Sequence, residues 1–490
     1  MNSINEVKKK LSRYPVQELV SFLELESYKI LGKSYHEIYK PKYIFPHFIE
    51  TLAIIIISMD DTHKSIRSIQ SKLFINDIND ILRYINDQSF PPDTDTNEEI
   101  RLELLMNPIT MQQFSYQIDY DAIEYRYTYI FTHTDTIKNS LFQNTGTNDF
   151  SVISFFFGLI PQLNSTSDQL LKNNLYVLKI ILDLIFNKYP KLYKILSYDV
   201  KSILQYQDSI SDINSIPSLL FSYRPIREKP IITKNNRTYF ILPHCFTFAC
   251  TDGLIISITE NNENLKNHIG KEIMEDYIND IIRNTKMYDV AVPKIKYKYV
   301  NKYDIDPSDA VFKSGDTIVF LEFKFRTFKR KFSINNKESV KKEYEYMIGA
   351  TEELLKSYIK YKEGYYKPFS THEYLKNEFL IVSYFYYATF SRTAIIEELC
   401  KKDKYKEYKE FLYSHLLICD LATLESYFLY DADIIYALKD FSSKNLLDQF
   451  EMSKKNHLNK IVSNKLDELH EKYRNDYIRD LIEKVQKNNE

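Results

Sequence analysis

The stretch that decides the fold is DAVFKSGDTIVFLEFKF, residues 309–325. It divides into two apolar runs, Asp309–Lys313 and Thr317–Phe325, joined by a polar link that contains Gly315. Short runs rich in Val, Ile and Phe on either side of a Gly-Asp pair are typical of a β-hairpin. Side chains alternate between the two faces of a strand, and both faces of the second run begin with apolar residues. The stretch therefore predicts a hairpin whose second strand lies in the interior of a sheet.

Two charged residues end this otherwise apolar strand. Glu322 and Lys324 share the face that begins with Ile318 and Phe320. Charges on a buried strand are costly unless they are paired or bind a metal. A hairpin centred near residues 314–315 places Asp309 opposite about residue 320 and beside Glu322. Two carboxylates and one lysine are thus predicted to converge at one end of the hairpin.

This combination of residues favours one kind of chemistry. Two neighbouring carboxylates repel each other unless one is protonated or a divalent cation lies between them. Hard oxygen ligands suit Mg²⁺, which also binds phosphate oxygens, and Mn²⁺ is the expected alternative. Lys324 would position or deprotonate a water, or stabilise charge in the transition state. The pattern predicts phosphodiester hydrolysis, whereas the competing interpretation is a solvated Glu322–Lys324 pair without function.

The flanking segments predict the rest of the domain. Before the hairpin come a helix over Gly270–Ile282 and a strand-like segment over Val290–Val300. After it come a long helix over Lys337–Tyr361 and two apolar runs, Phe379–Tyr384 and His415–Leu421. The order α-β-β-β-α-β-β predicts an α/β class with a mixed sheet and helices packed on it.

Asp309, then twelve residues, then Glu322-Phe323-Lys324 on an apolar strand resembles the PD-(D/E)xK nuclease superfamily. The resemblance covers about residues 265–430 and implies a restriction-endonuclease-like αβββαβ core. It implies that Asp309 and Glu322 are catalytic and hold Mg²⁺, and that Lys324 is the catalytic lysine. The motif's proline is displaced, because the chain reads Pro307-Ser308-Asp309, so Asp306 and Asp304 remain alternatives to Asp309.

Many members of that superfamily also carry a glutamate on the helix before the sheet. Here the predicted apolar stripe of that helix comprises Met274, Tyr277, Ile278 and Ile281. Glu275 borders the stripe, whereas Glu272 points further toward solvent. The resemblance therefore assigns a catalytic and metal-binding role to Glu275, with Glu272 in reserve. The long helix after the hairpin offers further candidates at Lys341, Glu345 and Glu352.

Local charge supports contact with nucleic acid, and the resemblance implies DNA more than RNA. Residues 286–342 contain 14 Lys and Arg against 7 Asp and Glu, in a chain whose net charge is −2. Cations beside the carboxylates would bind the phosphate backbone without reading sequence. The competing interpretation of the first three lysines is a solvated strand edge. The predicted nucleic-acid-binding residues are Lys294, Lys296, Lys298, Arg326, Lys329, Arg330 and Lys331.

The 490 residues predict several domains. Residues 1–215 are expected to form a large all-α recognition or regulatory region, with helices over Val16–Leu31 and Leu170–Phe186. Residues 216–262 are expected to form a small connector with strands at Thr238–Leu242 and Leu254–Ile258. Residues 263–430 form the predicted nuclease domain, and 431–490 a helical C-terminal tail. The N-terminal helical region is the expected surface for a partner protein or a second copy, whereas the C-terminal helices are expected to pack as a terminal pair rather than to bind a partner.

Composition excludes other classes. With 44% hydrophobic and 27% charged residues the chain is not an intrinsically disordered protein. Its strongest apolar runs, Leu52–Ser58 and Val152–Pro161, are too short to cross a bilayer, and no signal peptide is recognisable, which favours the cytoplasm. The four cysteines are too far apart for a paired zinc motif, and His244 beside Cys245 is interpreted as part of the core. The superfamily resemblance implies restriction or antiviral defence, with a catalytically inactive nucleic-acid-binding relative as the alternative.

Overall fold

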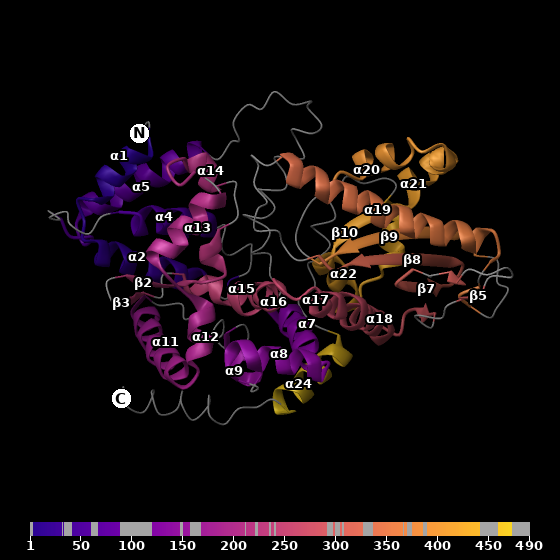
Figure 1. Ribbon diagram of the computed structural model, residues 1–490, viewed down its shortest axis with the longest axis horizontal. Coiled ribbons are helices and arrows are strands. Elements are labelled where there is room, and N and C mark those ends of the chain that lie inside the picture. The colour runs from indigo at the N-terminus through magenta and orange to yellow at the C-terminus, as the bar shows by residue number, and fades with distance from the viewer. Residues whose placement is uncertain are drawn as a thin grey trace. The chain divides into compact units, whose positions relative to one another are not determined.

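The computed structural model describes residues 3–31, 33, 42–59, 67–88, 120–147, 150–156, 168–210, 212–220, 224–234, 237–239, 242–291, 297–298, 304–305, 308–326, 337–365, 367–369, 375–385, 390–441 and 459–472. These residues form two compact units (Figure 1), one containing Met1–Asn262 and the other Glu263–Thr327 and Lys337–Glu471. The connector expected over 216–262 belongs to the first unit, and residues 431–471 belong to the second.

The first unit is mainly helical, as the sequence predicts. Its core surrounds α4 (Pro46–Ile57), all of whose residues are buried, and α5 (Lys72–Asp87), which buries one stripe that includes Phe74, Ile78, Ile81 and Ile85. That i, i+4, i+7 spacing is the signature of an amphipathic helix. The other helices are α1 (Ile4–Leu11), α2 (Val16–Ile30), α7 (Tyr120–Thr132), α8 (Asp135–Thr145), α9 (Phe150–Ser154), α11 (Asp168–Lys188), α12 (Pro190–Leu196), α13 (Val200–Ile210), α14 (Ile216–Leu220), α15 (Phe246–Cys250) and α16 (Asp252–Thr259).

A three-stranded sheet of order β1-β2-β3 completes this unit. β1 (Ser197–Asp199) is parallel to β2 (Ile231–Lys234), which is antiparallel to β3 (Arg237–Tyr239). The strand predicted over Leu254–Ile258 is wrong, because these residues lie in the helix α16. A short apolar run does not distinguish a strand from a helix that is buried on nearly all sides. Two 3-10 turns, η3 (Pro225–Arg227) and η4 (Pro243–Cys245), follow prolines in this region.

The second unit is built on a five-stranded sheet of order β10-β9-β8-β7-β4. Neighbouring strands from β4 to β8 are antiparallel, whereas β8, β9 and β10 are parallel. β8 lies in the middle of the sheet, as its two apolar faces predict. The strands are β4 (Asp289–Val290), β7 (Ala310–Ser314), β8 (Thr317–Lys324), β9 (Asn377–Tyr384) and β10 (Leu416–Asp420), and a separate pair is formed by β5 (Tyr297–Lys298) and β6 (Asp304–Ile305).

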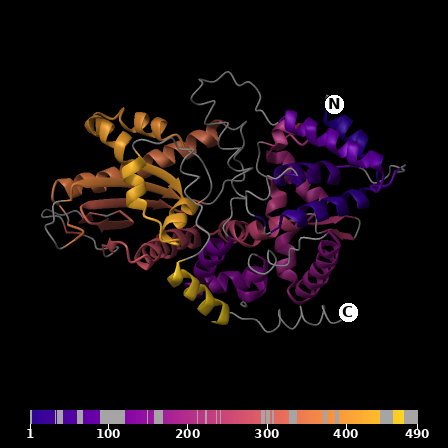
Figure 2. The ribbon, with the colours of Figure 1, turned by 180° about the vertical axis from the view of Figure 1, so that it is seen from behind.

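Helices cover both faces of this sheet (Figures 1 and 2). α19 (Lys337–Lys362) lies along one face and shares a core with α20 (Arg392–Leu399) and α21 (Lys409–His415). α18 (Glu275–Asn284) and α22 (Leu421–Phe428) lie on the opposite face. The remaining helical segments are α17 (Glu263–His268), the π-helical η5 (Ile269–Met274), η6 (Asp403–Tyr408), α23 (Ile434–Phe441) and α24 (Lys460–Lys472).

The sequence predicts this unit in outline, as a mixed sheet with helices packed on it. Within the strand expected over Val290–Val300, however, the described residues form only the end of β4 and the separate strand β5, and the helices between β9 and β10 were not predicted. The hairpin turn lies at Gly315 and Asp316, and Gly315 has a positive φ of 56° that glycine adopts without strain. Among the described residues, no helix is both long and apolar enough to cross a membrane.

Candidate functional site

The register of the hairpin brings the two predicted carboxylates together. Ala310 pairs with Leu321, so Asp309, the residue before β7, falls opposite Glu322. The sequence predicts Asp309 opposite about residue 320. The observed partner lies two residues further along the chain because the turn is one residue later than expected. Asp309 Oδ2 accepts a hydrogen bond of 2.7 Å from the backbone N–H of Phe323. Glu322 is only 8% exposed.

Lys324 joins this pair and adds a residue that the sequence did not predict. Its Nζ donates to Glu322 Oε1 at 2.7 Å and to Glu353 Oε2 of α19 at 2.5 Å. Glu353 is itself 59% exposed at the side chain, so the lysine bridges a buried and an exposed carboxylate. The ammonium group is therefore held in place from two elements, the strand β8 and the helix α19.

The helix before the sheet places Glu275 near Asp309. Asn279 Nδ2 donates to the carbonyl oxygens of both Glu275, at 2.9 Å, and Asp309, at 3.0 Å, which ties α18 to the start of β7. Glu275 is half-buried and its charge acts on the Asp309 carboxyl. Glu272, the reserve candidate, is 63% exposed and pairs with His268 at 2.9 Å. Of the two glutamates, the structure brings Glu275 to the site.

Glu275 follows directly on the π-helical segment η5. A Cβ on Gly270 in this segment would come within 2.9 Å of Phe325 Cβ, so the missing side chain allows the helix to approach the end of β8 closely. π-helical turns are rare and occur frequently at functional sites. The close approach and the change in helical pitch together set the position at which α18, and with it Glu275, begins.

The serine inserted before Asp309 anchors the strand start. Ser308 is buried, and its backbone N–H and its hydroxyl lie 3.1 and 3.0 Å from Ser357 Oγ on α19. Of the two alternatives to Asp309, Asp304 belongs to the separate β5–β6 pair and Asp306 lies outside the described residues. The described geometry thus favours Asp309.

Burial and repulsion from neighbouring carboxylates raise the pKa of both Asp309 and Glu322. For Asp309 the main cause is burial, followed by the charge of Glu275, and the Phe323 N–H only partly opposes them. For Glu322 the causes are burial and the charge of Asp309, with Lys324 acting in the opposite direction. Near neutral pH the pair consequently retains protons that isolated carboxylates would lose.

The pKa of Lys324 is raised as well, but for a lysine this favours the charged form. Burial opposes its charge, but Glu322 and Glu353 outweigh that effect and raise the pKa of the lysine. A lysine with a raised pKa stays protonated at neutral pH and cannot remove a proton from water. Of the roles predicted for Lys324, orienting water and stabilising negative charge are the ones that this environment allows.

The accessory residues predicted on the long helix do not belong to the site. Glu352 pairs with Lys402, Lys356 and Lys404, and hydrogen bonds from Lys402, Lys356 and Tyr405 lower its pKa to about 2. Lys341 pairs only weakly with exposed Glu345, at 3.9 Å. The residues of α19 that do reach the strand ends follow an i, i+3, i+4 row. Its members with described contacts are Glu343, Tyr346, Glu353 and Ser357. The spacing of these residues could have indicated a shared helix face from the sequence. It does not show that this face meets the strand ends until the position of the strands is known.

The predicted nucleic-acid-binding residues are only partly described. Arg326 is held by Glu343, with Nη2 to Oε1 at 2.9 Å, and its guanidinium lies 4.0 Å from the Tyr346 ring centroid. Its charge is thus already paired, which makes it a structural link between β8 and α19 and argues against its predicted contact with phosphate. Lys298 lies in β5. Lys294, Lys296, Lys329, Arg330 and Lys331 lie outside the described residues.

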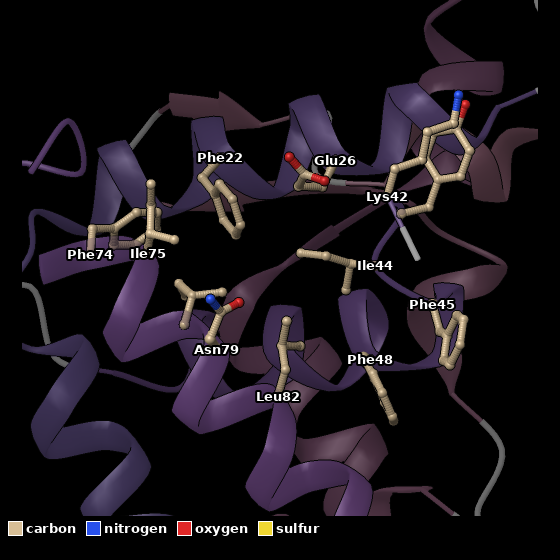
Figure 3. A pocket seen from close by; sticks show the side chains of 12 residues that line it. Phe22, Glu26, Lys42, Ile44, Phe45, Phe48, Phe74, Ile75, Asn79 and Leu82 are labelled. Atoms are coloured by element: carbon tan, nitrogen blue, oxygen red, sulfur yellow. The ribbon is translucent and has the colours of Figure 1, made fainter. Parts of the chain in front are cut away.

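The first unit contains a pocket of ≈ 340 Å³ between α2, α5 and the segment that leads into α4 (Figure 3). Its walls are mostly apolar and include Phe22, Ile44 and Leu82. Its polar members include Glu26, which accepts from Lys29 at 2.8 Å. None of the predicted site residues lines this pocket.

Comparison with known proteins identifies no relative of this chain. No protein-family model matches the chain, and neither a curated protein nor a solved structure is significantly similar to it.

Proposed function

We propose that the protein is a metal-dependent nuclease that hydrolyses phosphodiester bonds, most readily in DNA. The observation that carries the proposal is the pair of half-buried Asp309 and buried Glu322, with Lys324 held beside it at the end of a central strand. Buried carboxyl groups with raised pKa values are typical of functional sites, because a fold that needs only stability avoids them.

The three carboxylates are the type of ligand that suits a hard divalent cation, although their oxygens do not all lie within 4.8 Å of one another. Asp309, Glu322 and Glu275 would hold Mg²⁺ or Mn²⁺, since carboxylate oxygens are the ligands these ions prefer. The two raised pKa values fit the same idea, because a bound cation would offset both the burial and the repulsion that raise them. When bound, the ion would polarise a phosphoryl oxygen and acidify a water.

The chain's own residues would supply the remaining steps. A water oxygen would attack phosphorus while the ester P–O bond breaks, the water would lose a proton, and the departing oxygen would take a proton from the solvent. The ionised form of a carboxyl group whose pKa is raised toward neutrality is suited to accept the proton of the water. The protonated Lys324 would orient the water and stabilise the charge that grows on the phosphoryl oxygens, while Glu353 fixes the position of its ammonium group.

Charge and resemblance favour nucleic acid as the substrate. The excess of Lys and Arg over residues 286–342 surrounds the hairpin in the sequence and would draw in a polyanion. The resemblance to the PD-(D/E)xK superfamily supports DNA and a role in restriction or antiviral defence.

One contact favours a second candidate, a nucleic-acid-binding protein without activity. Lys324 is engaged by Glu353 as well as by Glu322, so its ammonium group has two carboxylate partners before any phosphate arrives. If substrate does not displace Glu353, the protein would bind nucleic acid and leave it intact.

The test incubates the purified chain with plasmid, linear duplex, single-stranded DNA and RNA in Mg²⁺, Mn²⁺ or EDTA. Glu322→Gln and Asp309→Asn are compared with Glu352→Gln, a control on α19 that is turned toward Lys402. We expect metal-dependent cleavage by the wild type and the control, and a loss of about 100-fold or more in the two site variants.

The remaining outcomes separate the candidates. Cleavage that survives both site substitutions would refute the proposed site. Binding without cleavage in every form, and with Glu353→Gln equally inactive, would favour the non-catalytic protein.

A further inference from the structure

A second cluster of polar residues lies deep in the first unit. Glu50 of α4, His244 and Cys245 of η4, and Arg224 and Arg227 beside η3 come together although α4 and η4 are far apart in the sequence. All five are buried, and Glu50 is 0% exposed. The candidate nuclease site uses none of them.

Three of these residues present metal-ligating atoms to one another. His244 Nε2 lies 3.5 Å from Glu50 Oε1 and 3.4 Å from Cys245 Sγ, and all three atoms lie within 4.8 Å of one another. Neighbouring ligand atoms in a tetrahedral zinc site are about 3.3–3.8 Å apart, given bonds of about 2.0–2.3 Å. Two of the three separations thus already match those of a zinc site, and the third, between Glu50 and Cys245, is within 4.8 Å.

Hydrogen bonds from neighbouring residues orient these ligand atoms, as hydrogen bonds to the ligands of a bound metal do. Ser27 Oγ lies 2.7 Å from His244 Nδ1 and can accept a hydrogen bond from the Nδ1–H group. In that tautomer the lone pair of Nε2 is directed at Glu50 and Cys245. Arg224 and Arg227 both donate to Glu50 Oε2, the latter at 2.9 Å, which turns the other oxygen toward His244. Hydrogen bonds to the far atoms of a ligating histidine and carboxylate are a regular feature of metal sites.

We propose that Glu50, His244 and Cys245 form a structural binding site for Zn²⁺, separate from the Mg²⁺ site of the proposed nuclease. A donor set of one sulfur, one nitrogen and one oxygen favours zinc over Mg²⁺, which prefers oxygen alone. His47, one turn before Glu50 on α4, is also buried and its Nδ1 lacks a hydrogen-bond partner among the described residues, but it lies outside the group whose ligand atoms are all within 4.8 Å of one another. Water is therefore the expected fourth ligand.

The main energetic cost of binding a zinc ion here is its positive charge, because Arg224 and Arg227 are buried beside the site. Burial would raise the pKa of Glu50, but Arg227 and Arg224 outweigh it and hold that pKa well below its ordinary range, so the carboxylate is ready to ligate. Burial raises the pKa of the Cys245 thiol, which must lose its proton to the solvent as the metal binds. Exchange of one proton for Zn²⁺ adds one positive charge beside two arginines. The competing interpretation is a buried ionic anchor that holds α4 to η3 and η4 without metal.

The test measures zinc in the full-length chain by plasma mass spectrometry after zinc loading and exhaustive dialysis. Cys245→Ser and His244→Gln are compared with Cys250→Ser, a control that removes an equally buried thiol five residues away. We expect about one zinc ion per chain in the wild type and the control, and about tenfold less in the two site variants. Replacement of zinc by Co²⁺ should give a thiolate charge-transfer band that only Cys245 can supply.

Each outcome decides the question. A wild-type chain that retains no zinc and gives no thiolate band with Co²⁺ would show that the cluster is an ionic anchor only. Equal zinc in Cys245→Ser and Cys250→Ser would also overturn the proposal. If the site variants fail to fold, the cobalt spectrum of the wild type still decides. Asp309→Asn should keep its zinc while it loses cleavage, so failure of the nuclease proposal would be recognised separately.

Discussion

At the scale of single residues, the environment of Glu322 predicts an unusual dependence of stability on pH. Its folded-state pKa is raised by burial and by Asp309. A carboxyl group with a raised folded-state pKa contributes stability below its unfolded pKa and loses that contribution as the pH rises through the folded value. The metal-free protein should therefore lose stability between about pH 5 and pH 9 because this pair must ionise.

Glu322→Gln should remove much of this loss. The amide is neutral at every pH, and Lys324 keeps Glu353 as its partner. We expect the variant to be more stable than the wild type by roughly 1–2 kcal/mol at pH 8.5 and nearly equal at pH 5.5. Thermal melting of both proteins in EDTA across this range tests the sign. Glu345→Gln, at a 59% exposed side chain, serves as the control that should not vary. A difference that stays constant with pH would contradict the explanation.

At the scale of elements, the contact between η5 and the end of β8 controls where Glu275 lies. Gly270→Ala would place a methyl group 2.9 Å from Phe325 Cβ, so one of the two elements must shift. We expect a loss of about 1–3 kcal/mol in stability and a larger loss of cleavage than the stability change explains.

A second glycine of the same unit provides the matched control. A Cβ on Gly349, in the middle of α19, meets nothing within 4 Å. Gly349→Ala should stabilise the protein by about 0.5–1 kcal/mol and leave cleavage unchanged. Urea unfolding and cleavage rates of the two variants are compared. If Gly270→Ala and Gly349→Ala had the same stability and the same cleavage rate, the close approach of η5 to β8 would not be what positions the site.

At the scale of the whole molecule, charge is unevenly distributed. A net charge of −2 over 490 residues coexists with the excess of Lys and Arg over residues 286–342. If phosphates bind to this segment, the logarithm of the affinity should fall linearly with the logarithm of salt concentration. The simultaneous replacement of Lys329, Arg330 and Lys331 by alanine should lower the slope by up to about 3.

The control replaces three lysines that are already paired elsewhere. Lys401, Lys402 and Lys404 form ion pairs with Glu398 and Glu352, so their replacement changes the net charge equally. We expect this triple variant to keep the wild-type slope, as measured by fluorescence anisotropy with a labelled duplex at several salt concentrations. An equal fall in both triple variants would indicate an effect of net charge alone.

Local patterns predicted much of the second unit. The alternation of side chains in 309–325 predicts the hairpin and the interior position of β8, and the structure confirms both. Helical spacing likewise predicts α2, α11 and α19 to within about two residues at each end. These predictions succeed because periodicity and turn residues act over a few residues. The run Leu254–Ile258 failed because full burial in a helix and in a strand demand the same apolar residues.

The sequence by itself determined which residue types end the central strand, and therefore that Asp309, Glu322 and Lys324 share one end of a hairpin. The tertiary structure alone decided that Glu353 holds the lysine, that Asn279 ties α18 to Asp309, and that Ser357 anchors Ser308. It also decided that Glu50 meets His244. Contacts of this kind depend on how whole elements pack against one another. Packing is set by the summed burial of many side chains, so no short pattern in the chain encodes it.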